Sequence, residues 1–126
     1  MSKKTTRKKA WQFGHLGESI AAWTLRLKGY SILATRFKTP VGEVDLVARK
    51  GQLLVFVEVK TRRRQGMKEQ LISSKQQRRI GRAASAFVQK HPETSGFAMR
   101  FDFILVRPWR MPLHIQNAWR PGNERF

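Results

Sequence analysis

The feature that most constrains the fold is a pair of strand-like segments, residues 42–49 and 52–61, separated only by Lys50 and Gly51. The first segment alternates polar and apolar residues, and the second is rich in Val, Leu and Phe at odd and even positions alike. Two such segments joined by a glycine-containing turn predict a tight antiparallel hairpin. Since a strand that is apolar on both faces is usually covered on both, the hairpin is expected at the centre of a sheet.

Helical and strand-like segments flank this hairpin in an order typical of a mixed α/β domain. Apolar residues at helical spacing define two helices, and glycine and proline mark where these helices end. The predicted elements are a helix from about residue 13 to Gly29, strands at 31–37, 42–49 and 52–61, a loop at 62–73, a helix at 74–90 before Pro92, and strands at 101–106 and 113–118. The expected inner faces are Leu16, Ile20, Trp23 and Leu27 on the first helix, and Ile80, Ala83, Ala84, Phe87 and Val88 on the second.

A length of 126 residues fits one domain, expected at residues 13–126, after a flexible basic arm at residues 1–12. The chain has 26 Lys and Arg against 8 Asp and Glu, a net charge of +18, which favours a polyanionic partner. Nucleic acid is the first candidate, ahead of an anionic membrane surface or an acidic protein. The alternative is that the charge only keeps the domain in solution.

The absence of cysteine excludes disulfides, thiolate zinc sites and a cysteine nucleophile. No segment approaches the roughly 20 apolar residues that span a bilayer, and no apolar segment follows the basic N-terminus. We therefore expect a cytoplasmic protein that is not associated with membranes.

Three of the few acidic residues, Glu43, Asp45 and Glu58, lie inside the apolar hairpin. With Lys50 and Gly51 as the turn, Asp45 would oppose Phe56 and Glu43 would oppose Glu58, so that all three carboxylates and Lys60 share one face. Carboxylates gathered in this way repel one another unless a cation lies between them. Ligands that are all oxygen favour Mg²⁺ or Mn²⁺, and a metal beside a lysine is a combination suited to phosphodiester hydrolysis. The alternative is a solvated edge hairpin with a surface ion pair between Glu58 and Lys60.

These residues also resemble a known motif. Asp45, followed after twelve residues by Glu58-Val59-Lys60, resembles the PD-(D/E)xK motif of the restriction-endonuclease-like superfamily, with Val44 in place of proline. A longer set of segments resembles the YraN family of small bacterial proteins, over roughly residues 14–119. These segments are Gly17-Glu18, Gly42-Glu43-Val44-Asp45-Leu46-Val47-Ala48, Val55-Phe56-Val57-Glu58-Val59-Lys60-Thr61-Arg62, Lys75-Gln76-Gln77-Arg78-Arg79, Arg100-Phe101-Asp102 and Asn117-Ala118.

The resemblance implies a restriction-endonuclease-like αβββαβ core, similar to that of Holliday-junction resolvases, and a metal-dependent endonuclease activity on DNA. Asp45, Glu58 and the Val59 carbonyl would then bind Mg²⁺ or Mn²⁺, and Lys60 would be the catalytic lysine. Glu18 would hold a second metal or its water, or would only favour the start of a helix. Gln76 would reach the same site from the second helix, or would be solvated. Glu43 would be a ligand or only a charge on the same face.

Basic side chains adjoin the candidate site and would position a phosphate backbone without reading its sequence. The residues are Arg62, Arg63 and Arg64, which follow the site directly, and Lys75, Arg78, Arg79 and Arg82 on the second helix. DNA is the expected partner, and RNA stays open. The competing interpretations are a nucleic-acid-binding module without catalysis and a scaffold for protein contacts. A symmetric homodimer would suit a four-way junction, although no apolar patch in the sequence marks an interface.

Overall fold

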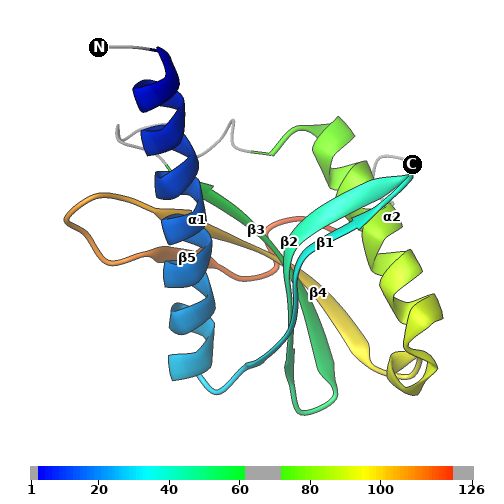
Figure 1. Ribbon diagram of the computed structural model, residues 1–126. Helices are drawn as coiled ribbons and strands as arrows, with labels where there is room; N and C mark the ends of the chain where they lie inside the picture. The colour runs from blue at the N-terminus through cyan, green and yellow to red at the C-terminus, as the bar shows by residue number, and fades with distance from the viewer. Residues whose placement is uncertain (1–2, 62–71, 121–126) are drawn as a thin grey trace.

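The structure is a computed structural model that describes the backbone of residues 3–61 and 72–120 and their side chains from residue 15 onward. Five strands form one sheet in the order β1-β2-β3-β4-β5, and two helices lie on its opposite sides (Figure 1). The elements are α1 (Lys3–Leu27), β1 (Ser31–Thr39), β2 (Gly42–Lys50), β3 (Leu53–Thr61), α2 (Ser74–Lys90), the short 3₁₀ helix η2 (Pro92–Thr94), β4 (Ala98–Val106) and β5 (Leu113–Ile115). The predicted order of helix, three strands, helix and two strands is confirmed.

Strand β3 lies at the centre of the sheet, antiparallel to β2 and parallel to β4. The parallel pair is possible because α2 connects the two strands across one face of the sheet. One core cluster lies under α2 and includes Leu54, Phe56 and Phe87, while a second lies under α1 and includes Val55 and Val57. Strand β3 is therefore buried on both faces, as its sequence predicted.

The hairpin prediction was correct in the two faces of β3 and wrong by two residues in its register. Observed partners include Lys50 with Leu53 and Val47 with Phe56, so the turn is formed by Gly51 and Gln52. Gly51 has a left-handed φ of +61° at the first central position of this turn. A type II′ hairpin turn takes glycine at that position, whereas a turn at Lys50 and Gly51 would place lysine there.

Helix α1 differs from the prediction at its start and in its inner face. It begins at Lys3, whereas the sequence predicted a helix start at about residue 13. Lysine, arginine and alanine are good helix formers, and an established helix extends at little cost. The buried residues are Ala21, Ala22 and Leu25, whereas Trp23 and two of the other residues expected inside, Leu16 and Leu27, are exposed. Small residues occupy the face of α1 that contacts the sheet, because the helix lies close to it. A Cβ atom on Gly17 would come within 2.3 Å of Thr61 Cγ2.

Helix α2 matches its predicted face, with Ile80, Ala83, Ala84 and Phe87 buried. Serine 73 caps its first turn by accepting a hydrogen bond from the Gln76 N–H. None of the helices in the described part of the chain is long and apolar enough to cross a membrane.

A change of Gly42 to Ala is expected to destabilise the fold by about 1–3 kcal/mol or more. A Cβ atom at Gly42 would lie 2.0 Å from the Arg79 carbonyl oxygen, so β2 and the backbone of α2 would have to separate. The free energy of unfolding in urea measures this effect. Gly96→Ala is the matched control, because a Cβ atom there meets nothing within 4 Å. Equal stability of the two variants would contradict the close packing of β2 against α2.

Candidate active site

The candidate site lies where β2 and β3 separate. The last paired residues of the two strands are Leu46 and Val57, and Asp45 immediately precedes Leu46 on β2. The Asp45 carboxylate accepts a hydrogen bond from the Val59 N–H at 2.8 Å, and so fills the gap that the diverging strands leave. The N–H and C=O of one strand residue point to the same neighbouring strand. The Val59 carbonyl therefore faces the same gap as the Asp45 carboxylate.

An irregularity in β2 directs Asp45 into this gap. Val44 and Val47 both belong to the core cluster under α2, whereas Leu46 belongs to the cluster under α1, so the alternation of faces breaks between Val44 and Val47. On β1, Arg36 lies at the same level, between the pairs Thr35 with Leu46 and Phe37 with Val44. Arg36 has a left-handed φ of +52°, so both strands are irregular at this level.

Glu58 is the buried centre of the site, with 5% of its surface exposed. Lys60 Nζ lies 3.2 Å from Glu58 Oε2. The Gln76 side-chain amide donates a hydrogen bond to the same Oε2 from the start of α2. The structure thus brings Asp45, Glu58, Lys60 and Gln76 together, and the expectation that Gln76 reaches this place rather than solvent agrees with the contact.

Burial in this position raises the pKa of both acids. It raises the pKa of Glu58 to about 8, and the neighbouring Asp45 carboxylate raises it further against the effect of Lys60. Burial also raises the pKa of Asp45, against the lowering effect of the Val59 N–H. Two carboxylates and a backbone carbonyl at one gap, with like-charge repulsion between the acids, form a donor set that fits Mg²⁺ or Mn²⁺.

The expected convergence of three carboxylates on one face is wrong. The Glu43 carboxylate lies 3.5 Å from an Arg79 guanidinium nitrogen and is half exposed. Because the register is shifted by two residues, Asp45, not Glu43, reaches the level of Glu58. Glu18 pairs with Arg36 at 2.7 Å, although its charge still contributes to the raised pKa of Asp45. Among the residues that the structure describes, no three Asp, Glu, His or Cys side chains are grouped to hold a metal.

The basic residues predicted to contact phosphates divide into two sets. Lys75, Arg78 and Arg82 are exposed on α2, the helix that supplies Gln76 to the site, and exposed Arg79 is paired with Glu43. The predicted contacts Arg62, Arg63 and Arg64 lie outside the described residues. The basic residues of α2 thus lie on the same helix as Gln76, an arrangement that suits a phosphate backbone crossing the site.

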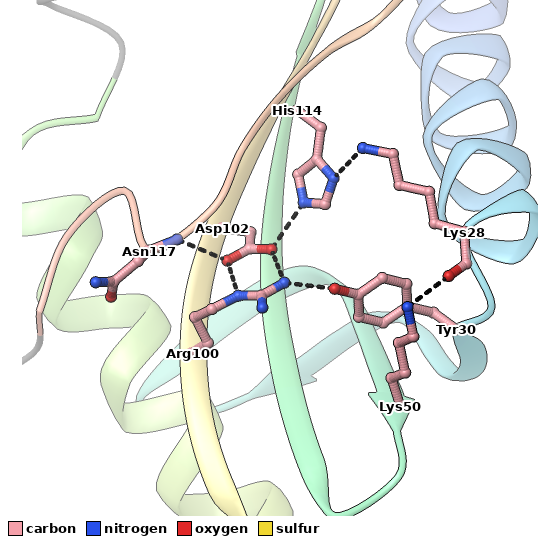
Figure 2. Close-up of polar contacts among 7 residues, drawn as sticks. All are labelled: Lys28, Tyr30, Lys50, Arg100, Asp102, His114 and Asn117. Carbon is pink, nitrogen blue, oxygen red and sulfur yellow. Dashed lines mark hydrogen bonds and ion pairs between the residues drawn. The ribbon is translucent and has the colours of Figure 1, made fainter.

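A buried polar network on the opposite face of the sheet was largely missed from the sequence. Asp102 on β4 has none of its surface exposed. It accepts hydrogen bonds from Arg100 at 2.8 and 2.7 Å and from the Asn117 N–H at 3.0 Å (Figure 2). The sequence predicted a structural pairing of Asp102 with Arg100, which is confirmed, but it did not indicate that Asn117 joins them.

His114 extends this network to α1. His114 Nε2 lies 2.7 Å from Asp102, and Lys28 Nζ lies 2.8 Å from Nδ1 (Figure 2). Since an ammonium only donates, Nδ1 accepts, and Nε2 carries the proton that is donated to Asp102. Arg100 also donates to the Tyr30 hydroxyl at 2.6 Å. The network therefore joins the end of α1 to β4 and β5, and we assign it a structural role.

Comparisons with known proteins agree with this architecture. The sequence model of the uncharacterised protein family UPF0102 matches residues 17–106. A UPF0102 protein of Chelativorans sp. (strain BNC1) is 45% identical over 116 residues, which cover 92% of this chain and 94% of the relative. A UPF0102 protein of Paramagnetospirillum magneticum is 49% identical over 111 residues, which cover 85% of this chain and 86% of the relative. These matches confirm the resemblance to the YraN family.

A solved structure shares the fold. It is that of Hjc, a Holliday junction resolvase from the archaeon Archaeoglobus fulgidus. The TM-score is 0.51 at 16% sequence identity, over 79% of this chain and 72% of that protein. The likeness confirms the predicted α/β fold, a mixed sheet flanked by helices and similar to that of a resolvase.

Proposed function

This chain belongs to the uncharacterised protein family UPF0102, and from its resolvase-like fold and its site we propose that it is a metal-dependent endonuclease that hydrolyses phosphodiester bonds in DNA. The observation that carries the proposal is the pair of half-buried Asp45 and buried Glu58, with Lys60, where β2 and β3 separate. The preferred substrate is proposed to be branched or otherwise structured DNA, as in repair or recombination, because the chain is strongly basic and carries no sequence-reading motif.

Each residue has a proposed role in this reaction. Asp45, Glu58 and the Val59 carbonyl would hold Mg²⁺ or Mn²⁺, which supplies Lewis-acid polarisation of the phosphoryl oxygen when bound. The Lys60 ammonium stabilises the negative charge that develops on the phosphate, or orients the attacking water. Gln76 holds the Glu58 carboxylate in place through its hydrogen bond. The exposed basic side chains of α2 position the phosphate backbone beside these groups.

The test incubates the purified protein with a four-way junction, a flap and a linear duplex, in Mg²⁺, in Mn²⁺ and in chelator. We expect cleavage that needs the metal, that Asp45→Ala loses, and that is accompanied by unchanged DNA binding in the variant. Tight, salt-sensitive binding without metal-dependent cleavage of any substrate would overturn the proposal in favour of a binding module without catalysis.

A further inference from the structure

A hollow of about 360 Å³ lies between α1 and β1, beside the candidate active site. Its size is within the range of pockets that bind small ligands. Leu46, the residue after Asp45 on β2, forms part of its wall, and so does Glu18, whose charge reaches Asp45. Other residues that line the hollow are Trp23 and Arg26 on α1 and Thr35 and Arg36 on β1.

Trp23 provides an aromatic surface at this hollow. The side chain was expected in the core, but 60% of its surface is exposed. The Arg26 guanidinium lies over its ring, 5.1 Å from the centroid. An exposed tryptophan beside an arginine is the combination on which proteins stack unpaired bases, since every base has an aromatic face.

Arg36 gives the hollow a second positive charge. Its left-handed φ of +52° interrupts the alternation of β1, so consecutive residues Thr35 and Arg36 are both exposed and both line the hollow. Such a conformation is costly for a residue other than glycine and clusters at functional sites. Glu18 accepts a hydrogen bond from Arg36 Nε at 2.7 Å and fixes the guanidinium. Two guanidiniums against one carboxylate leave the hollow suited to a phosphate.

We propose that this hollow binds one unpaired nucleotide of the strand that enters the active site, with its base on Trp23 and its phosphate beside Arg26 and Arg36. The inference rests on the proposed function for the identity of its ligand. Arg36 and Asp45 lie at the same level of neighbouring strands, so a nucleotide held here adjoins the bond to be cleaved. A base stacked inside a duplex cannot reach Trp23 without unpairing. Substrates with unpaired nucleotides near the cleaved bond are therefore favoured over intact duplex.

The experiment measures the binding of a fluorescently labelled oligothymidine by anisotropy in chelator, where no cleavage occurs. Trp23→Ala is expected to weaken binding about tenfold or more, the size of one stacked base. Trp23→Phe keeps an aromatic ring and should retain most of the affinity. Trp109→Ala is the matched control, because this second tryptophan is fully exposed but belongs to the connection between β4 and β5. Circular dichroism verifies that each variant is folded.

Three outcomes would overturn the inference. The first is unchanged binding by Trp23→Ala, and the second is an equal loss in Trp23→Ala and Trp109→Ala. The third is a change from dimer to monomer in sedimentation with binding intact, which would make the hollow a protein interface. Cleavage is scored separately with Mg²⁺ on a flap. If the parent never cleaves but its binding depends on Trp23, the nuclease proposal fails and the nucleotide site stands.

Discussion

The variant Glu58→Gln is expected to lose DNA cleavage by about 100-fold or more while its metal-free fold becomes more stable at pH 8. The two effects have opposite signs because the carboxylate that would hold the metal is also a buried charge beside Asp45. Glutamine has nearly the same shape and can still accept the hydrogen bond from Gln76, but it brings no negative charge. Groups whose removal stabilises a fold and abolishes its activity are typical of functional sites.

The pH dependence of stability gives this prediction a definite direction. Burial and Asp45 raise the pKa of Glu58 from 4.5 to about 8 in the folded protein. The folded state therefore holds this proton more tightly than the unfolded state does. The stabilisation is fully present below pH 4.5 and is lost as the pH rises through about 8. In metal-free buffer the parent should become less stable across this range, and Glu58→Gln should remove much of that loss.

Chemical denaturation in chelator at several pH values measures the stability, and the flap assay with Mg²⁺ measures the cleavage. Glu93→Gln is the control, because it makes the same chemical change at an exposed carboxylate in η2. It should alter neither the cleavage nor the pH profile. Full cleavage by Glu58→Gln, or a parent whose stability is flat between pH 5 and pH 8, would contradict the assigned position of Glu58.

The sequence was sufficient to predict the order of elements and the covered faces of β3, because both follow from local periodicity. It was not sufficient for the register of the hairpin, since glycine suits either position of a two-residue turn. That shift of two residues separated Glu43 from Glu58 and brought Asp45 to its level. The structure thus brings the predicted pair of Asp45 and Glu58 to one level and places the Glu43 carboxylate beside Arg79 instead.

The face of α1 was mispredicted for a reason that lies in packing. The spacing of large apolar residues on this helix indicated one side, but the helix lies too close to the sheet to place Trp23 there. Small residues, Gly17, Ala21 and Ala22, occupy the contact. A periodicity count gives these residues little weight, although they decide how near two elements approach. The exposed tryptophan that results is the feature on which the nucleotide site depends.

The second large effect is expected for Asp102→Ala, which should cost about 3–5 kcal/mol of the free energy of unfolding. Burial alone would favour the neutral acid, but hydrogen bonds from His114 and Arg100 hold the pKa of Asp102 below its ordinary value. Removal of the carboxylate would leave Arg100 Nε and the Asn117 N–H without their acceptor. A loss of this size is a large share of the stability of a typical domain, about 5–15 kcal/mol.

Two further variants separate the buried charge from a general loss of contacts. Asp102→Asn keeps an oxygen that can accept from the Asn117 N–H, but it removes the charge that faces Arg100, so an intermediate loss is expected. Glu43→Ala breaks the half-exposed ion pair with Arg79 and should cost at most about 1 kcal/mol. Urea denaturation measures the free energy of unfolding of all three variants.

The pH dependence of stability gives a further test of Asp102. Because its pKa is lowered in the folded protein, the ionised carboxylate stabilises the fold above pH 3.8, and this stabilisation is lost as the pH falls below that value. The parent should therefore lose stability in acid more steeply than Asp102→Asn. An Asp102→Ala protein as stable as Glu43→Ala would show that the network does not hold α1, β4 and β5 together.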